Sequence, residues 1–296
     1  MSSIDPVEQL AGYERWLESQ PLAMSTRRAY RGHARRFVEF LASWPGEGGD
    51  PLVDAHARDY AVRDFKSHLK TVRRAKPASV NLALAAMDHF YRYLGAGRPD
   101  VRREELAQAA PRALSPEELR RFLRAVERRE SPRDRAIALL LVNTALRIGE
   151  CAALDVDDIA VSARKGMVVV REGKGDAYRE VPLNAEARAA LDDWTAVRRG
   201  QLGASADRGL FISRKGARLS TRAIDLVIRS LASDAELTLS AHTLRHTCLT
   251  RLVRGGADIV LVAELAGHRR LETTRRYSLP SQADRQDAME RLQVEY

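Results

Sequence analysis

The chain has 296 residues, of which 45% are hydrophobic, and its mean hydropathy is −0.36. This apolar fraction excludes an intrinsically disordered chain, and the longest purely apolar run, residues 136–142, is too short to span a bilayer. Lysine and arginine outnumber aspartate and glutamate by 49 to 40, so the net charge is +9 and nucleic acid is a natural partner.

At about 100–200 residues per domain, a chain of this length is expected to form two domains. The two cysteines, Cys151 and Cys248, are too few for a disulfide framework, which favours a reducing compartment. The N-terminal residues lack the basic and apolar regions of a signal peptide. We therefore expect a cytoplasmic protein without a membrane segment.

The first part of the chain is predicted to be a small helical bundle. An early helix contains Trp16, and a second helix, capped by Ser25 or Thr26, runs to about Leu41. Further helices are expected at about residues 54–72 and 79–94.

Glycine and proline between positions 95 and 111 indicate a linker after this bundle. The sequence then runs Ser115-Pro116-Glu117-Glu118, which offers a helix N-cap, a proline at the first helical position and a capping-box glutamate. We predict a helical domain at residues 1–97, a linker at 98–112 and a second domain at 113–296.

The second domain is predicted to be mixed. Two β-prone runs, Met167–Arg171 and Tyr178–Leu183, flank a segment in which Gly173 and Gly175 supply turn geometry, so we expect a β-hairpin. Helices are expected near residues 116–129, 132–145, 185–199, 221–233, 243–254, 258–265, after 271 and at 281–292. The fold class is therefore mainly α with a small β-sheet.

Two basic clusters lie in the first domain. The first lies in residues 26–38, a segment without any acidic residue. It consists of Arg27, Arg28, Arg31, Arg35 and Arg36. Arg27, Arg31 and Arg35 follow i, i+4 spacing and share one helix face. The second cluster consists of Lys70, Arg73 and Arg74 with Lys76. Both are predicted to bind DNA phosphates; the alternative is a solvated charged surface.

Histidines gather in the last third of the chain, at positions 242, 246 and 268. A zinc motif of the form H-E-x-x-H is excluded because Thr243 occupies the glutamate position. No G-x-S-x-G elbow and no phosphate-binding loop occurs in the sequence, which excludes the usual hydrolase triad and nucleotide site. We expect no metal and no cofactor, and we expect His246 to be a hydrogen-bonded core histidine.

The remaining chemistry is attack on a phosphodiester without a metal. Such a reaction needs a nucleophile, fixed cations around the phosphate and a proton donor for the leaving oxygen. The sequence offers Tyr277 as the nucleophile and Lys174 as the proton donor. The candidate phosphate ligands are Arg147, Arg245 and His268.

Five ordered motifs resemble those of the tyrosine recombinases, the phage-integrase-like and Xer-like enzymes. They are TALRIGE (144–150), GKG (173–175) followed by Arg179 and VPL (181–183), HTLRHT (242–247), GGAD (255–258) with LAGH (265–268), and TTRRY (273–277). The chain departs from the family pattern at Ala145, where glycine is usual, at Ala266, where leucine is usual, and at Cys248-Leu249, where Phe-Ala is usual. None of these positions carries chemistry.

The resemblance implies a helical core-binding (SAM-like) domain followed by an α+β catalytic domain, together clamping duplex DNA. It implies a site-specific recombinase that cuts and rejoins DNA through a 3′-phosphotyrosyl link, without metal or ATP. Tyr277 is then the nucleophile, His242 the general base or proton shuttle, and Lys174 the acid for the 5′ oxygen. Arg147, Arg245 and His268 bind the phosphate, and Glu150 is expected to orient one of these groups.

The resemblance also implies partners. Recombination needs four protomers on two paired DNA sites, and the final helix at 281–292 is expected to dock on a neighbouring protomer or, alternatively, to pack in cis. Two other functions stay open at this level. One is a DNA-binding regulator that does not cut, and the other is a type IB topoisomerase, which would relax plasmids without a specific site.

Overall fold

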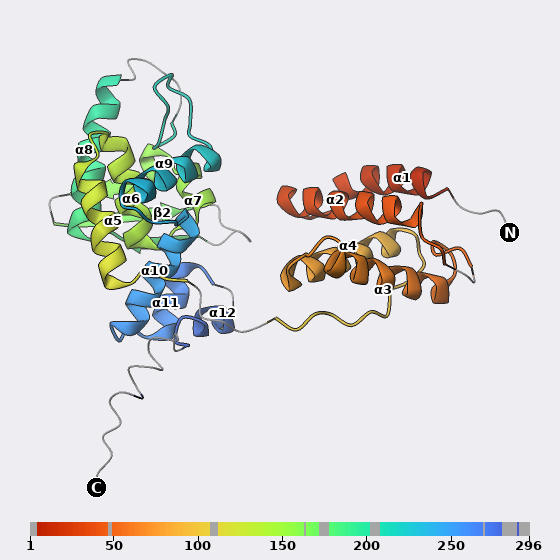
Figure 1. Cartoon of the computed structure of the whole chain (residues 1–296). Helices are drawn as coiled ribbons and strands as arrows, with labels where there is room; N and C mark the ends of the chain where they lie inside the picture. Colours follow the sequence, from red (N-terminus) through yellow and green to blue (C-terminus); the bar gives the residue numbers. More distant parts are fainter. Residues whose placement is uncertain are drawn as a thin grey trace, which may run out of the picture. The chain divides into compact units, whose positions relative to one another are not determined.

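The structure is a computed structural model. It describes residues 5–46, 49–106, 112–162, 164–171, 178–201, 208–268, 270–279 and 289. The chain divides into two compact units, Met1–Ala107 and Gln108–Tyr296 (Figure 1). As predicted, the fold is mainly helical with one small sheet. Among the described residues, no helix has the length and apolarity needed to cross a membrane.

The first unit is a bundle of helices around an aromatic core, as the sequence predicts. Its helices are α1 (Pro6–Glu18), α2 (Met24–Leu41), α3 (Ala55–Thr71) and α4 (Pro77–Tyr93). Tyr13, Phe37, Phe65 and Phe90 are fully or almost fully buried, and their rings pack edge to face. Burial of such aromatic side chains from every helix supplies most of the stabilisation of a bundle this small.

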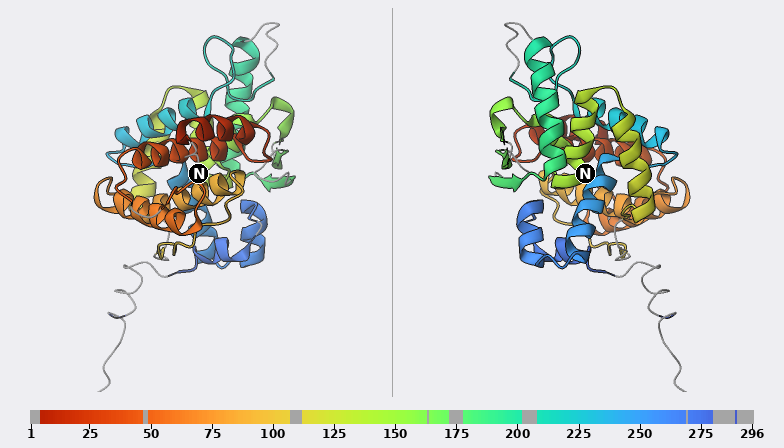
Figure 2. Two further views of the ribbon diagram at one scale, coloured as in Figure 1. Left: turned by 90° about the vertical axis from the view of Figure 1, so that its right-hand side faces the viewer. Right: turned by 90° about the vertical axis from the view of Figure 1, so that its left-hand side faces the viewer.

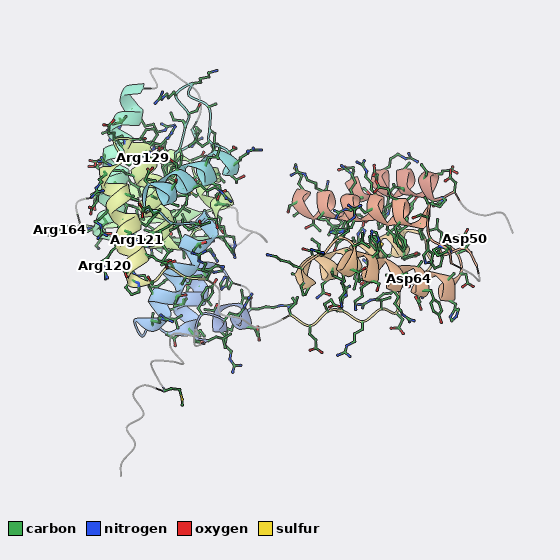
Figure 3. All side chains as sticks on the ribbon, viewed as in Figure 1. Asp50, Asp64, Arg120, Arg121, Arg129 and Arg164 are labelled. Carbon is green, nitrogen blue, oxygen red and sulfur yellow. The ribbon has the colours of Figure 1, made fainter. Side chains whose placement is uncertain are left out.

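Side-chain capping explains where two of these helices, α1 and α3, begin. Asp5 and Asp54 cap α1 and α3 by accepting hydrogen bonds from backbone N–H groups of the first turn. The predicted cap for α2 is wrong, because α2 already begins at Met24 and its N-cap residue, Ala23, makes no side-chain hydrogen bond. Asp64 on α3 (labelled in Figure 3) lies on the first unit. Its carboxylate accepts a hydrogen bond from Trp44 Nε1 at 2.9 Å, which ties the turn after α2 to α3.

Residues that follow α4 lie along the first unit. Glu104 forms ion pairs with Lys66 at 2.8 Å and Lys70 at 3.0 Å, and Arg103 pairs with Asp88 at 2.6 Å. This part of the expected linker is therefore bound to the helical bundle. Residues 107–111 of the expected linker lie outside the described residues.

The second unit is built around α6, which is buried on nearly every side. Its helices are α5 (Pro116–Arg128), α6 (Pro132–Thr144), α7 (Ile148–Ala153), the 3-10 helix η1 (Val156–Asp158), α8 (Ala185–Gln201), α9 (Thr221–Asp234), α10 (Ala241–Arg254), α11 (Ile259–Ala266) and α12 (Leu271–Arg275). α6 packs against α5, α8, α9 and α10. The predicted capping box at Ser115 and Glu118 is present at the start of α5. Both views of Figure 2 show the blue helices α10, α11 and α12 lying together.

A three-stranded antiparallel sheet covers one side of this core. Its strands are β1 (Ile159–Val161), β2 (Gly166–Val170) and β3 (Arg179–Pro182), in the order β1-β2-β3. The predicted pairing of the two β-prone runs is confirmed, with Val168 opposite Val181 and Val170 opposite Arg179. Residues 172–177, which contain the expected hairpin tip, and 281–288 and 290–292 of the expected last helix lie outside the described residues. β1 and α7 were not predicted.

Candidate active site

The ends of four helices meet at a cavity of about 230 Å³. Its lining residues are Arg147, His242, Arg245, His246, His268, Thr273, Arg276 and Tyr277. Five of the six predicted catalytic residues therefore line one cavity within the second unit. The sixth, Lys174, lies outside the described residues.

Tyr277 enters this cavity from the turn that follows α12. Its side chain is only 6% exposed and packs in an apolar cluster with Leu249 on α10 and Val262 and Ala266 on α11. The backbone N–H of Tyr277 donates to Thr274 O at 2.9 Å, which closes the turn. The candidate nucleophile is thus held by the same unit that supplies the histidines and arginines.

The residue in direct contact with the Tyr277 hydroxyl is His246. His246 Nδ1 lies 2.8 Å from Tyr277 Oη, and the two ring centroids are 5.4 Å apart. The prediction that His246 is a core histidine is wrong, because its ring is half-buried and faces the cavity. His242, one helical turn earlier, is exposed, and its ring centroid lies 4.0 Å from that of His246.

His268 is oriented from both sides. Arg245 Nη2 lies 3.0 Å from His268 Nε2, and Thr274 Oγ1 lies 2.8 Å from Nδ1. A guanidinium can only donate, so Nε2 accepts from Arg245 and Nδ1 carries the proton that is donated to Thr274. The neutral tautomer of His268 is thereby determined by its neighbours.

Arg245 is the most deeply buried of the three arginines that line the cavity, with 3% of its surface exposed. It donates to Ala145 O and, at 2.7 Å, to Ala266 O. Ala145 has a left-handed backbone, with φ of 53°, which explains why glycine is usual at this position in the similar family.

Arg147 is the N-cap residue of α7, and its side chain keeps 35% of its surface exposed. Its Nη1 donates to Glu150 Oε1 at 2.7 Å and its Nη2 to Gly267 O at 3.1 Å. The backbone N–H of Arg147 also donates to Glu150 Oε2, at 2.7 Å. These bonds hold the guanidinium at the cavity wall and leave part of it accessible.

Burial controls the protonation states in the cavity. Burial raises the pKa of the Tyr277 phenol, although the positive charges of Arg245, Arg276 and Arg147 act in the opposite direction. Burial, followed by the charge of His242, lowers the pKa of His246 to about 4. Burial, followed by the charge of Arg245, likewise lowers the pKa of His268 to about 4. At neutral pH the cavity therefore contains a protonated phenol beside a neutral imidazole.

Arg245 stays cationic despite its burial. Burial and the charge of Arg147 lower the pKa of the Arg245 guanidinium to about 10. The pKa of His242 is also lowered, first by burial and then by Arg245 and Arg147. Two arginine cations with neutral histidines form a surface that favours an anionic group such as a phosphodiester.

Glu150 and Arg179 contact the cavity residues without lining the cavity themselves. Glu150 is 5% exposed and accepts hydrogen bonds from Arg147 and from Arg179 on β3. The expectation that Glu150 orients a neighbouring motif residue agrees with these bonds. In the sequence, Arg179 and Thr274 stand out only as members of the motifs at 173–183 and 273–277. No local signal in the sequence marks either as a contact of the cavity residues, because the partners of Arg179 are distant in the chain.

The predicted DNA-binding stripe on α2 has acidic partners in the structure. Arg27 pairs with Glu18 on α1 at 3.4 Å, Arg31 also pairs with Glu18, and Arg35 pairs with Glu14 at 2.6 Å. Residues 26–38 contain no acid, and the acids that pair with these arginines come from the neighbouring helix α1. Glu39 on α2 adds a further negative charge one helical turn after Arg35. This face is therefore partly neutralised.

The other predicted DNA-binding residues have fewer partners. Lys70 pairs with Glu104, and Arg36 donates to Gly32 O at 2.9 Å. Arg28, Arg73 and Arg74 are exposed, and none has an ion-pair partner among the described residues.

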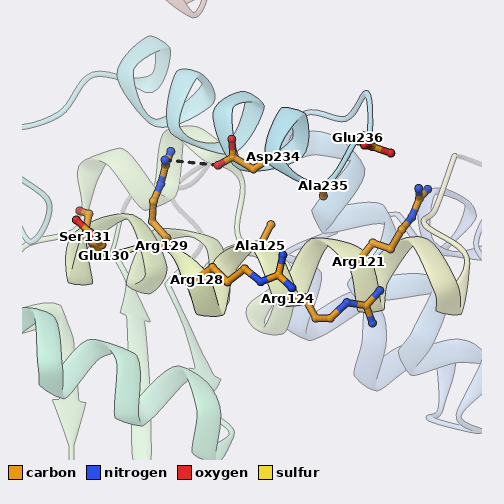
Figure 4. Close-up of a pocket in the computed structure, with 10 residues that line it drawn as sticks. All are labelled: Arg121, Arg124, Ala125, Arg128, Arg129, Glu130, Ser131, Asp234, Ala235 and Glu236. Carbon is orange, nitrogen blue, oxygen red and sulfur yellow. Dashed lines mark ion pairs between the residues drawn. The ribbon is translucent and has the colours of Figure 1, made fainter.

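A second, larger cavity of about 610 Å³ lies between α5 and the end of α9 (Figure 4). Four arginines of one stretch of chain line it, at positions 121, 124, 128 and 129, together with Asp234 and Glu236. Arg129 pairs with Asp234 at 3.5 Å. Among the described residues that line it there is a serine, Ser131, but no histidine, tyrosine or cysteine, so no imidazole lines the cavity to act as a base for that hydroxyl. Within the described part of the chain, no cluster of three or more histidine, cysteine, aspartate or glutamate side chains is arranged to hold a metal ion.

Two family models match the chain. The model described as "Phage integrase family" matches residues 112–283, and the model described as "Phage integrase, N-terminal SAM-like domain" matches residues 10–96. The two matches together span both units of the structure.

Curated proteins and a solved structure are similar over nearly the whole chain. Tyrosine recombinase XerC of Roseiflexus castenholzii is 30% identical over 289 residues, which cover 92% of this chain and 88% of that protein. Tyrosine recombinase XerD of Mycobacterium leprae is 33% identical over an alignment 301 residues long, gaps included, which covers 92% of each chain. The crystal structure of XerH site-specific recombinase bound to difH substrate shares the fold, with a TM-score of 0.74, 19% identity and 98% of each chain covered.

Proposed function

Because this chain belongs to the phage integrase family and is a tyrosine recombinase, we propose that Tyr277 is the residue through which it cuts and rejoins duplex DNA. One observation carries the proposal. The Tyr277 hydroxyl lies 2.8 Å from a histidine nitrogen, in a cavity that also contains Arg147 and Arg245. A nucleophile, a base and phosphate ligands are thus within reach of one bound phosphodiester.

The first step is attack of Tyr277 on the phosphorus atom. A free phenol has a pKa of about 10, and burial raises the pKa of this one further, so the hydroxyl needs a base. In the tautomer that carries its proton on Nε2, His246 accepts the phenolic proton at Nδ1 as the oxygen–phosphorus bond forms. His246, now protonated on both nitrogens, releases its Nε2 proton, and the exposed ring of His242 beside it relays that proton to solvent, which keeps His242 as the proton shuttle.

The phosphate is held by groups that oppose its growing negative charge. Arg147 and Arg245 donate to the non-bridging oxygens, for which the planar guanidinium is well shaped. In the free protein, His268 Nε2 accepts from Arg245, so His268 can donate to the phosphate only after gaining a second proton. An incoming phosphate anion favours that protonation because it adds negative charge beside the ring.

The bond to the 5′ oxygen breaks as the tyrosyl bond forms. We assign protonation of this leaving oxygen to Lys174, on the resemblance of the GKG motif alone. The 3′-phosphotyrosyl link conserves the energy of the phosphodiester, so a 5′-hydroxyl from a second strand can displace Tyr277 and complete strand exchange without ATP.

The remaining assignments concern the assembly. Exchange between two DNA sites requires four active centres, and we propose a tetramer on paired sites, with the helix at 281–292 docked on a neighbouring copy. We assign duplex contacts to both domains, with the boundaries 1–97, 98–112 and 113–296. We also propose that the protein acts in the cytoplasm; its two free cysteines, both buried, fit a reducing compartment.

A gel experiment tests the function directly. The purified protein and its Tyr277→Phe variant are incubated in EDTA with labelled duplexes captured by Tyr277→Phe from a random DNA library and with DNA flanking the gene. A nick close to the cut lets the short leaving strand diffuse away, which traps the covalent product. We expect a denaturation-resistant protein–DNA adduct with the wild type only.

Each other outcome would contradict part of the proposal, either the function or the identity of the nucleophile. Specific binding with no adduct in either protein would indicate a regulator that does not cut. Relaxation of a supercoiled plasmid that lacks the captured sequence would indicate a topoisomerase. An adduct that persists in Tyr277→Phe would assign the nucleophile to another residue.

A further inference from the structure

Three successive carbonyl groups at the end of α11 accept hydrogen bonds from three different arginines. The pairs are Arg179 Nε to Leu265 O at 3.0 Å, Arg245 Nη2 to Ala266 O at 2.7 Å and Arg147 Nη2 to Gly267 O at 3.1 Å. The last carbonyls of a helix have no partner within the helix and lie at the negative end of its dipole, so they bind cations. The end of α11 therefore contributes to the position of two arginines that line the cavity, Arg147 and Arg245.

Arg179 differs from the other two arginines because it does not line the cavity. It is 7% exposed, and its guanidinium also binds both carboxylate oxygens of Glu150, with Nη1–Oε1 at 3.0 Å and Nη2–Oε2 at 2.7 Å. All three of its nitrogen atoms are thus used, two on Glu150 and one on α11. Such a fork fixes the distance and the angle between two elements that are remote in sequence.

Glu150 is shared between Arg179 and Arg147. Each of its oxygens accepts one bond from Arg179 and one from Arg147. Burial alone would raise the pKa of this carboxyl, but hydrogen bonds from Arg179 and Arg147 outweigh burial and lower it. With Arg179 absent, the buried carboxylate would keep Arg147 as its only charged partner among the described residues, and the attraction of Arg147 toward Glu150 would grow.

Gly267 allows Arg179 to approach this closely. Its backbone is left-handed, with φ of 62°, and a Cβ at this position would lie 2.9 Å from Arg179 Nη1. His268 follows Gly267 directly. Gly267 therefore serves two purposes. Its left-handed backbone ends α11, and its lack of a side chain allows the Arg179 guanidinium to come close.

We propose that Arg179 is a positioning residue for DNA cleavage, which holds Glu150 and the end of α11 at a fixed separation and so directs Arg147 and His268 toward the phosphate. This inference rests on the proposed function. Arg179 touches no reacting atom, and its effect passes through Glu150, Arg147 and the Gly267–His268 turn. A misplacement of about 1 Å in such a group can cost about 10²-fold in rate.

The test compares Arg179→Lys with wild type on the nicked duplexes captured by Tyr277→Phe. Lysine keeps the buried positive charge but cannot span Glu150 and Leu265 O at once. We expect the single-turnover rate of adduct formation to fall about 10²-fold, with DNA affinity within about threefold of wild type. The matched control is Arg135→Lys on α6, whose partner is Asp193 at 3.6 Å, and we expect it to leave both quantities unchanged.

Chemical rescue separates positioning from folding. In Arg179→Ala, about 10 mM guanidinium, far below denaturing concentrations, should bind beside Glu150 and restore the rate at least about tenfold, whereas equal sodium should not. We expect Gly267→Ala to show the same rate defect without guanidinium rescue, since its added methyl group displaces Arg179 instead of removing it.

Two results would overturn the proposal. One is a wild-type adduct rate in folded Arg179→Lys. The other is a loss in Arg179→Lys that appears only in DNA affinity or in the midpoint of thermal unfolding. If Arg179→Ala does not fold, the comparison of adduct rates between Arg179→Lys and wild type decides whether the proposal holds. Failure of the proposed function is seen separately, as absence of the adduct with the wild-type protein.

Discussion

The hydroxyl of Tyr277 and Nδ1 of His246 are 2.8 Å apart, although the two residues are separated by 31 positions in the chain. The first belongs to the turn after α12 and the second to the middle of α10. Their contact gives the candidate nucleophile a neutral proton acceptor before any DNA is bound. It also supports distinct proposed roles for the two histidines of α10, since within the described part of the chain no hydrogen bond or ring contact joins His242 to Tyr277.

Replacing the proposed base should cost more than replacing the shuttle. We expect His246→Gln to lower the single-turnover rate of adduct formation by about 10²–10⁴-fold, because glutamine can accept the hydrogen bond of Tyr277 but cannot take its proton. His242→Gln should have a smaller effect, since solvent can replace an exposed shuttle. DNA affinity, measured by gel shift, serves as the control. A reversed order of the two variants would assign the base to His242.

The pH dependence of cleavage should reflect the buried position of His246. Because burial and the charge of His242 lower the pKa of His246 to about 4, the imidazole stays unprotonated, and therefore active, far below the ordinary histidine range. We expect no fall in the rate from about pH 8 to 5.5 at subsaturating DNA, a regime that reports the free protein. Proton uptake by His268 on phosphate binding acts in the opposite direction, because it raises the rate as the pH falls. A midpoint near pH 6.5 would contradict this assignment. Circular dichroism at each pH confirms that the protein remains folded.

The orientation of His268 should depend on Thr274. Thr274→Val removes the oxygen that lies 2.8 Å from His268 Nδ1 in a fully buried position, and we expect about a tenfold loss of adduct rate with a loss of about 1–3 kcal/mol in stability. Thr247→Val is the matched control. Thr247 is also fully buried and accepts from Leu114 N at 2.9 Å, outside the cavity. We expect Thr247→Val to lose similar stability in thermal unfolding but to keep the wild-type rate of adduct formation.

Arg73 and Arg74, which have no ion-pair partner among the described residues, should contribute more to the salt dependence of DNA binding than the paired arginines of α2. Each phosphate contact contributes about 0.9 to the slope of log affinity against log salt concentration. We expect the double variant Arg73→Ala, Arg74→Ala to lower this slope by more than Arg31→Ala and Arg35→Ala together, because Arg31 and Arg35 already have acidic partners on α1. Equal changes in the two pairs would mean that DNA displaces Glu14 and Glu18, whose exposed pairs are each worth at most about 1 kcal/mol.

Acid should destabilise the first unit through His33. This histidine is 7% exposed, its Nδ1 has no hydrogen-bond partner, and burial, followed by the charge of Arg36, lowers its pKa to about 4. Between about pH 6.5 and 4 the unfolded chain binds a proton that the folded chain does not, so the free energy of unfolding falls as the pH falls. We expect His33→Leu to reduce this dependence by up to one proton, or about 1.4 kcal/mol per pH unit, in urea unfolding. An unchanged slope would show that His33 is not responsible.

Local patterns in the sequence were sufficient for most helices and for the candidate chemistry. The capping box at Ser115 and Glu118 acts within one turn, so it could be read directly, and the β-prone runs around Val168 and Val181, with glycines between them, predicted the paired strands. Where an element is short or depends on its neighbours, prediction failed. α7 and β1 have six and three residues, and each depends on tertiary contacts for its stability.

The order of the motifs, and with it the family, the fold class and five of the residues that line the cavity, was determined by the sequence alone, because motif spacing is a property of the chain. Only the tertiary structure decided which histidine touches Tyr277, which acids neutralise the α2 stripe, and that Arg179 joins Glu150 to α11. These contacts join residues on different elements, and side-chain hydrogen bonds act only at about 3 Å. Packing of the helices therefore has to bring such partners together before any of them can act.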